Sequence, residues 1–272
     1  MTQAIQKKLN DSAFARWTAL ILVALTMFFG YMFVDVLSPL QNMLESTRGW
    51  SPTIFGLYGG SEFILNVCGF LLVAGIILDK MGVRFTGILS ASLMVLGAGI
   101  KFYGLSNYFY EGGFGYEFLS SFLTDIPASA KLACLGFMVF GCGTEMAGVT
   151  VSRAIVKWFT GKELALAMGL EMAIARLGVF AVFSLSPWVA NWGGDPSVAR
   201  PVAVVGLLLC IGLLTYIAFS VMDFKLDRQT EADTPIGETE EPFKVADLKN
   251  LFSSKTFLIV SAPVSYTHLR AH

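Results

Sequence analysis

The sequence predicts an all-α membrane protein built around a bundle of six transmembrane helices. Of the 272 residues, 55% are hydrophobic and only 14% are charged. A soluble domain carries about 25% charged residues, which cover its surface. The mean hydropathy is +0.65 and the net charge is −1. This composition excludes a disordered chain, argues against a soluble enzyme, and offers no basic surface for a nucleic-acid partner.

Six apolar stretches have the length of about 17–25 residues that a helix needs to cross a bilayer. They cover residues 17–37, 55–78, 85–105, 132–151, 164–189 and 202–222. Each is continuously apolar, whereas the strands of a membrane β-barrel alternate between apolar and polar residues. A seventh apolar run begins at residue 256 and stops at 264, so it is predicted to be only the start of another helix.

The distribution of Lys and Arg predicts a cytoplasmic N-terminus. That orientation puts 13 of the 19 basic residues on the inner side and four on the outer side. We therefore expect an integral multi-pass protein in the inner (plasma) membrane of a bacterium.

Hydrophilic segments divide the chain into five parts. Residues 1–16 are predicted as a cytoplasmic tail and 17–222 as the bundle. Residues 223–255 form an acidic cytoplasmic linker with an amphipathic helix over 245–252, and 256–264 begin the seventh span. Residues 265–272 interrupt that span and resemble a translated adapter, so we expect that they are not native and that the gene is truncated.

Residue patterns for catalysis or metal binding are missing from the sequence. The two histidines are His268 and His272, and the four cysteines lie inside predicted spans without zinc-type spacing. No phosphate-binding glycine loop or Ser/His/Asp set can be assembled. The sequence predicts no enzyme, no cofactor and no metal.

A motif of glycines and charges, Gly75-Ile-Ile-Leu-Asp79-Lys80-Met-Gly82-Val-Arg84, lies between the second and third spans. Gly75 permits close helix approach, Gly82 permits a tight turn, and Asp79 and Arg84 can pair with neighbouring helix ends. The motif resembles the G-x-x-x-D-[RK]-x-G-x-[RK] loop of the major facilitator superfamily. The resemblance implies a conformational latch of Gly75, Asp79, Lys80, Gly82 and Arg84, which holds the two halves of a transporter in the outward-facing state.

A second set of motifs resembles the lysosomal dipeptide-transporter family of that superfamily. Residues 158–170 (WFTGKELALAMGL) and 175–178 (ARLG) follow its W-F-x-G-K-E-L…G-L…A-R-[IL]-G pattern, and residues 141–145 (GCGTE) follow its G-x-G-x-E. The resemblance covers residues 17–260. It implies the N-terminal half of a fold of about twelve helices, with a missing C-terminal six-helix lobe as partner.

Two charged residues lie near the middle of predicted spans, where a charge costs about 2.5–3.5 kcal/mol. Glu145 is in the fourth span and Arg176 in the fifth. Arg176 offers a bidentate donor for a carboxylate, and Glu145 offers a partner for an ammonium group, so together they suit a zwitterion. The resemblance implies that they contact the termini of a peptide. An internal Glu145–Arg176 pair that fixes helix packing is the alternative.

Two further acids belong to the predicted substrate site. Asp35 lies near the outer end of the first span, as a gate or site residue or simply in contact with water. Glu171 lies five residues before Arg176, about 140° around the helix, so the two are not expected to share a face. Glu171 is a candidate protonation site or a helix-interface acid. Charges closer to the span ends are expected to reach the surface: Glu62, Lys101 and Lys131.

The fourth span is rich in glycine, at positions 136, 141, 143 and 148, which predicts close helix contacts around Glu145. Position 137 carries Phe where many proton-coupled relatives carry Arg, and this weakens the expectation of proton coupling.

These features together predict half of a secondary transporter that moves a small zwitterionic solute, a dipeptide in the first place, by alternating access. A proton-coupled symporter of an organic anion is the alternative, with Arg176 on the carboxylate and Glu171 or Glu145 carrying the proton. A non-transporting membrane sensor or scaffold is the third option. The expected partners are the small-molecule substrate and the lipid bilayer.

Overall fold

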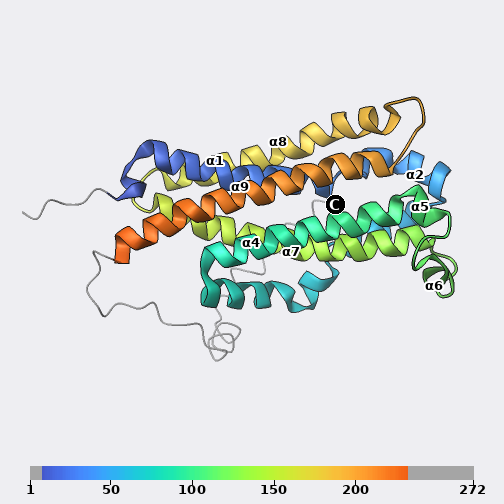
Figure 1. Cartoon of the computed structure of the whole chain (residues 1–272), viewed down its shortest axis with the longest axis horizontal. Helices are drawn as coiled ribbons and strands as arrows, with labels where there is room; N and C mark the ends of the chain where they lie inside the picture. Colours follow the sequence, from blue (N-terminus) through green and yellow to red (C-terminus); the bar gives the residue numbers. More distant parts are fainter. Residues whose placement is uncertain (1–7, 232–272) are drawn as a thin grey trace, which may run out of the picture. The chain divides into compact units, whose positions relative to one another are not determined.

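The computed structural model describes residues 8–231, and all regular structure in that range is helical. The long helices lie side by side in a bundle (Figure 1). They are α1 (Ala13–Val34), α4 (Leu71–Leu105), α7 (Ala128–Phe159), α8 (Leu164–Asn191) and α9 (Ala199–Glu231). Short helices lie at one end of the bundle: α2 (Gln41–Arg48), α5 (Asn107–Tyr110) and α6 (Tyr116–Ser120). Helix α3 (Pro52–Ser61) begins the helical stretch that continues into α4.

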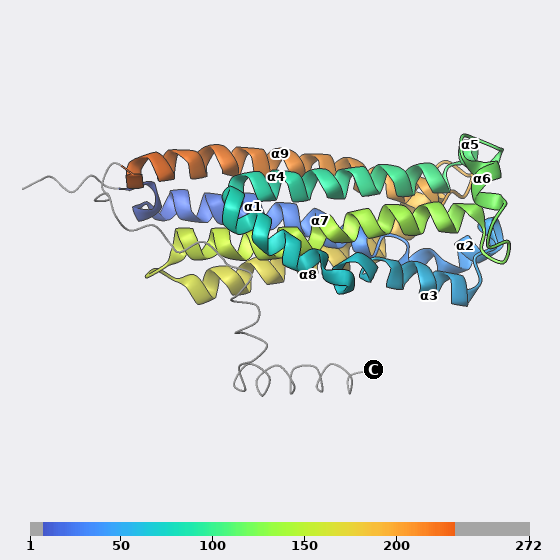
Figure 2. The same ribbon diagram turned by 90° about the horizontal axis from the view of Figure 1, so that it is seen from below.

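Five helical stretches in the described residues are long and apolar enough to cross a membrane, and one of them, Pro52–Leu105, is 54 residues long. Gly82 breaks that stretch with φ 75° and ψ 174°, a conformation that side-chain-bearing residues rarely adopt. The chain turns back on itself there, so α4 runs first one way and then the other (Figures 1 and 2). The predicted second and third spans are therefore the two arms of one helical hairpin, and the chain passes along the bundle six times.

The last described helix runs past the residue at which the hydrophilic linker was expected to begin. Helix α9 continues to Glu231, whereas the linker was expected to start at residue 223. The reason is that Asp223 is fully buried and paired with basic residues of other helices, so a polar residue continues the helix. The predicted helix over 245–252, the start of the seventh span and the tail over 265–272 lie outside the described residues.

Glycine brings α4 and α7 into backbone contact. A Cβ atom added to Gly97 would lie 2.5 Å from the Gly136 carbonyl oxygen, and one added to Gly136 would lie 2.6 Å from the backbone nitrogen of Lys101. A Cβ atom added to Gly143 would lie 2.6 Å from the carbonyl oxygen of Ser90 on α4. Close approach through small residues is the usual means of helix association in membranes, where the hydrophobic effect between helices is absent.

The other long helices arrange themselves around this pair. Helix α9 packs against α4 and α1, and α1 also packs against α8. Tyr216 of α9 fills the space above Gly87 of α4 and donates a hydrogen bond to the Val83 carbonyl oxygen, 2.9 Å away. Gly178 of α8 approaches the carbonyl oxygen of Phe28 on α1, which a Cβ atom would meet at 2.3 Å.

We predict that Gly97→Ala destabilises the bundle although alanine favours helices. The new methyl group would collide with the α7 backbone, and overpacking of this kind costs about 1–3 kcal/mol, against a gain in helix propensity of about 1 kcal/mol. Gly99→Ala is the matched control, because nothing lies within 4 Å of a Cβ atom at that position. Thermal unfolding in detergent micelles should show a lower melting temperature for Gly97→Ala alone. Equal melting temperatures would contradict the proposed backbone contact.

Candidate functional site

A small cavity lies between α1, α7 and α8 and contains charged groups. Its volume is about 180 Å³. Arg176 of α8 is exposed, and its guanidinium carbon lies 5.2 Å from the centre of the Tyr31 ring on α1. The lining residues come from three helices: Met27, Tyr31, Gly148, Ser152, Glu171, Met172, Ala175 and Arg176. The cavity therefore combines a cation, an acid, two hydroxyl groups and apolar side chains.

Glu145 lies beside this cavity without lining it. It is on α7, one helical turn before Gly148, and it is half-buried. The charges of Arg176, Glu145, Glu171 and Glu62 all act on the Tyr31 hydroxyl. Within residues 8–231, Glu145 and Arg176 form no ion pair with each other or with another side chain. Both charges are thus available to a ligand.

Glu171 lines the same cavity as Arg176, and its side chain is only 8% exposed. The two residues lie about 140° apart around α8. Both line the cavity because it spans a wide arc of the helix that also includes Met172 and Ala175. A buried acid next to an exposed arginine gives the cavity both signs of charge.

Asp35 lies in a different environment from the other three predicted site residues. It ends α1, and its Oδ1 accepts a hydrogen bond of 3.0 Å from the Ser38 hydroxyl. Its charge acts on Glu62, Lys101 and Tyr58. Glu171, Arg176 and Tyr31 thus line one cavity with Glu145 beside it, whereas Asp35 lies outside that lining, within electrostatic range of a second cluster formed by Tyr58, Glu62 and Lys101.

Lys101 belongs to that second cluster, and its expected position at the surface was wrong. It is 0% exposed, and its ammonium nitrogen lies 4.3 Å from the ring centre of Phe33, 4.5 Å from that of Phe137 and 5.0 Å from that of Tyr58. Its backbone sits where α4 and α7 touch, so the side chain is enclosed from its base. Glu62 is also buried, at 4% exposure. Only Lys131 behaves nearly as expected, since it is half-buried and donates to the carbonyl oxygens of Leu119 and Phe122.

The turn between the second and third crossings pairs its charges with other helices. Asp79 forms an ion pair with Arg153 of α7, and Arg84 forms one of 2.7 Å with Asp227 of α9. Lys80 is exposed, and nothing in the described residues lies within 4 Å of a Cβ atom at Gly75. The charges of this motif thus connect α4, α7 and α9, while Gly75 makes no close helix contact in this part of the chain.

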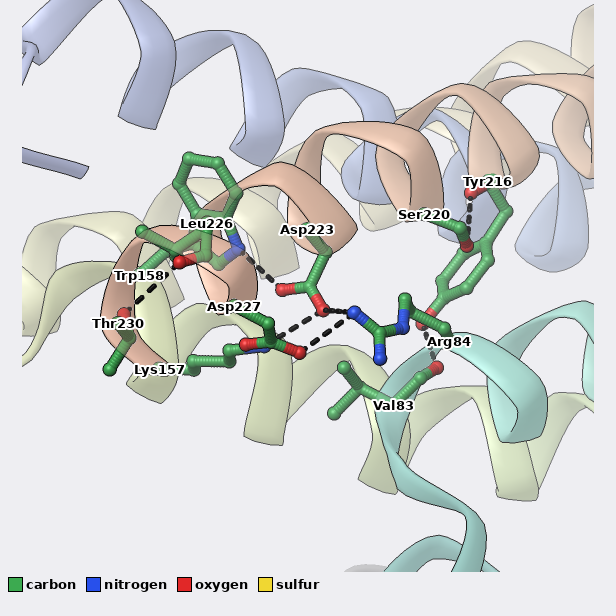
Figure 3. A network of polar contacts seen from close by, with 10 residues as sticks. All are labelled: Val83, Arg84, Lys157, Trp158, Tyr216, Ser220, Asp223, Leu226, Asp227 and Thr230. Atoms are coloured by element: carbon green, nitrogen blue, oxygen red, sulfur yellow. Dashed lines mark hydrogen bonds and ion pairs between the residues drawn. The ribbon is translucent and has the colours of Figure 1, made fainter. Parts of the chain in front are cut away.

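The centre of this connection is Asp223, which was not foreseen as a site residue. Figure 3 shows its carboxylate among basic and aromatic side chains of α4 and α7. It accepts hydrogen bonds from Trp158 Nε1 at 3.0 Å and from Lys157 Nζ at 2.8 Å, and Arg84 lies 3.8 Å away. Asp227, one turn later, also pairs with Lys157, at 2.6 Å. The spacing of two aspartates four residues apart, continuing an apolar helix, was the signal that could have revealed them.

Lys162 and Glu163, in the motif before α8, form ion pairs with residues at the beginning of α1 and just before it. Lys162 Nζ donates to Asp11 Oδ1 at 2.7 Å, and Arg16 pairs with Glu163 at 3.2 Å. The hydrogen bond from Lys162 holds the pKa of Asp11 below its ordinary value. These motif residues therefore have a structural role at this end of the bundle, away from the Arg176 cavity.

The described residues form a bundle of membrane-spanning helices with a charged cavity, and comparisons with known proteins assign the family of the chain. The family model described as Major Facilitator Superfamily matches residues 20–267, so the chain belongs to that superfamily. It is similar to the lysosomal dipeptide transporter MFSD1 of Pongo abelii, with 26% identity over 92% of the chain and 50% of the relative. The MFSD1 proteins of Bos taurus and Gallus gallus are 31% and 33% identical over 48% of the chain, covering 29% and 31% of their own lengths.

The chain spans at most about half the length of these relatives. No solved structure matches it. The relatives are vertebrate proteins whose name places them in lysosomes, so they lend no support to the expected bacterial inner membrane. What the family and the helices support is a multi-pass membrane protein.

We predict that Asp223→Ala lowers the free energy of unfolding by about 1–3 kcal/mol, because the buried Trp158 Nε1–H loses its acceptor, while Arg84 and Lys157 keep their ion pairs with Asp227. Asp227→Ala is the matched control. Its side chain is 30% exposed, so its loss should cost about 1 kcal/mol or less. Unfolding by denaturant, followed by circular dichroism in micelles, measures both values. Similar losses for the two variants would contradict the central role of Asp223.

Proposed function

We propose that this chain contributes half of the substrate pathway of a secondary transporter that moves a small zwitterionic solute, a dipeptide in the first place, by alternating access. One observation carries the proposal: Arg176, whose guanidinium lies over the Tyr31 ring, and Glu145, beside the same cavity on α7, bear opposite charges and form no ion pair in the described residues. Two uncompensated charges at membrane depth are costly and are by default functional.

The chemistry of a dipeptide matches these groups. The guanidinium of Arg176 can hold a carboxylate by two parallel hydrogen bonds, and the Glu145 carboxylate can accept from the ammonium group. Tyr31 lies against Arg176, and Ser152 supplies a hydroxyl on the same cavity. The name of the relatives, lysosomal dipeptide transporter, supports the same substrate class.

The ends of the bundle support alternating access. We assign the Gly75–Arg84 turn to the cytoplasmic side, as the distribution of Lys and Arg favours. Asp79, Lys80, Gly82 and Arg84 then form a latch at this end, with Arg153 and Asp227 as the partners within the chain. Movement of α4 relative to α7 and α9 would require these ion pairs to exchange.

A second candidate function is the proton-coupled transport of an organic anion. The observation that favours it is Glu171, which is buried, has no hydrogen-bond partner in the described residues and lines the cavity with Arg176. An acid in this position can carry a proton while Arg176 holds the anion. Asp35 does not line this cavity. It lies at the end of α1 and would act near the outer end of the pathway.

Uptake of labelled dipeptide by proteoliposomes tests the main proposal, with the product of the complete gene as the protein. Uptake that persists without a pH gradient would exclude obligate symport. Normal insertion and folding without uptake of any zwitterion or anion would favour a sensor or scaffold and contradict the proposal.

We predict that Arg176→Gln and Glu145→Gln each raise the KM for a free dipeptide by about 10–100-fold, which corresponds to about 1.4–2.8 kcal/mol. The two variants should differ with blocked substrates. Arg176→Gln should no longer distinguish a free dipeptide from its C-terminal amide, and Glu145→Gln should no longer distinguish it from its N-acetyl derivative.

Glu117→Gln serves as the control for these kinetics, because Glu117 is exposed on α6 and away from the cavity. Its KM should equal that of the wild type. If Arg176→Gln and Glu145→Gln also leave the KM and the discrimination unchanged, the site assignment is wrong even if transport occurs.

A further inference from the structure

The second crossing is broken near Glu62, about 15 Å along the helix from Pro52 at 1.5 Å per residue. Helix α3 ends at Ser61, a π-helical turn occupies Asn66–Phe70, and Gly69 within it has φ 106°. Irregular backbone at membrane depth is tolerated where protein covers it or where it lines a cavity. π-Helical turns are frequent at functional sites. The break in the second crossing is therefore a candidate functional site.

Unpartnered polar atoms collect at this break. Six buried side-chain nitrogen or oxygen atoms lack a hydrogen-bond partner in residues 8–231, and three of them are Tyr58 OH, Asn66 Oδ1 and Lys101 Nζ. Tyr58 and Asn66 lie four residues before and after Glu62, and Asn66 Nδ2 donates to the Glu62 carbonyl oxygen at 3.3 Å. Buried polar groups without partners are rare and each requires an explanation.

The charges of the cluster are compensated in different ways. Three aromatic rings surround the Lys101 ammonium group and stabilise its positive charge by cation–π interaction. The Glu62 carboxyl group feels Lys101 electrostatically but lies beyond ion-pair distance of it, and in the described residues it has no other partner. An ionised carboxylate in such surroundings is costly, and a carboxyl group avoids that cost by holding a proton.

We propose that Glu62 and Lys101 form a proton-binding site, separate from the Arg176 cavity, in which Glu62 carries an exchangeable proton. In one state Glu62 is a neutral carboxylic acid and Lys101 remains charged among its rings. In the other, the broken segment brings Glu62 to Lys101, the O–H bond breaks, the proton leaves to solvent, and the carboxylate pairs with the ammonium group. Lys101 keeps its charge in both states.

Glu145 links this site to the substrate cavity. It lies on α7 one turn after Gly141, where a Cβ atom would be only 2.2 Å from the Glu62 carbonyl oxygen, so its charge acts on Glu62 as well as on Tyr31. An ammonium group bound at Glu145 would cancel that charge and so favour the ionised form of Glu62. Substrate binding would then release the proton, and by linkage proton loss would tighten substrate binding. The ionisable groups in reach of Glu62 come from four helices or their ends: Tyr31 and Asp35, Tyr58, Lys101, and Cys134 and Glu145.

The first test needs no substrate and is therefore independent of the proposed function. Infrared difference spectra of the membrane-reconstituted product of the complete gene are recorded between acidic and alkaline pH. We expect a protonated-carboxyl band that Glu62→Gln removes and Glu117→Gln leaves intact. Lys101→Met should move the pH range in which the band disappears. A band unchanged in Glu62→Gln would overturn the proposal. If Glu62→Gln fails to fold, an unchanged pH range in Lys101→Met would overturn it equally.

The second test addresses the link to the substrate and rests on the proposed function. The Kd of a free dipeptide should fall as pH rises, by at most about tenfold per pH unit for one released proton. In Glu62→Gln this dependence should be lost. Absence of dipeptide binding at every pH, with the infrared result intact, would refute the proposed substrate and support the proton site. Binding that follows pH equally in both proteins would overturn the link.

Discussion

The close contact of α4 and α7 is the constraint on which the other features of this bundle depend. Gly97 and Gly136 allow the two backbones to touch, and Gly143 repeats the contact two turns further along α7. Glu145 follows Gly143 by two residues, about 200° around the helix, so it projects from the side of α7 opposite to α4. The contact that packs the bundle thereby directs an acid toward α1 and α8, where Arg176 and Tyr31 lie.

The same contact explains why Lys101 is buried. It follows Gly97 by four residues and so lies on the face of α4 that meets α7, with its backbone at the crossing itself. A lysine near the end of a membrane helix normally extends toward the surface. The side chain of Lys101 instead starts inside the interface between α4 and α7, and its ammonium group lies among aromatic rings from α1, α3 and α7.

How much of this could be predicted from the sequence depends on whether a feature is local. The six apolar segments, the turn at Gly82 and the close contacts of Gly136, Gly141 and Gly143 follow from length, conformational freedom and side-chain size. Gly148 carries the same local signal, yet nothing lies within 4 Å of a Cβ atom there and it lines the Arg176 cavity. Which side of α7 meets α4 is decided by both helices together, and a pattern in one of them cannot show it.

The charged residues show this limit most clearly. Asp223 looked like the first residue of a polar linker, because its partners Trp158, Lys157 and Arg84 are distant in sequence. Lys101 looked superficial for the same reason. In both cases the hydropathy of the sequence reflects the cost of burying a charge but not the interactions that offset this cost. Ion pairs stabilise the charge of Asp223, and aromatic rings stabilise that of Lys101.

Glu145 differs from these structural charges because nothing in the described residues neutralises it. One turn after it on α7, Gly148 lines the cavity of Arg176, which can hold an anion. One turn before it, Gly141 meets the backbone of Glu62, a buried acid that can hold a proton. A single helix packed through glycine on one side and carrying Glu145 on the other can thus connect two binding events through electrostatics alone. In the proposed alternating-access cycle, such coupling requires only that α7 keep its contact with the third crossing, at Gly97 and Lys101, while the broken second crossing moves.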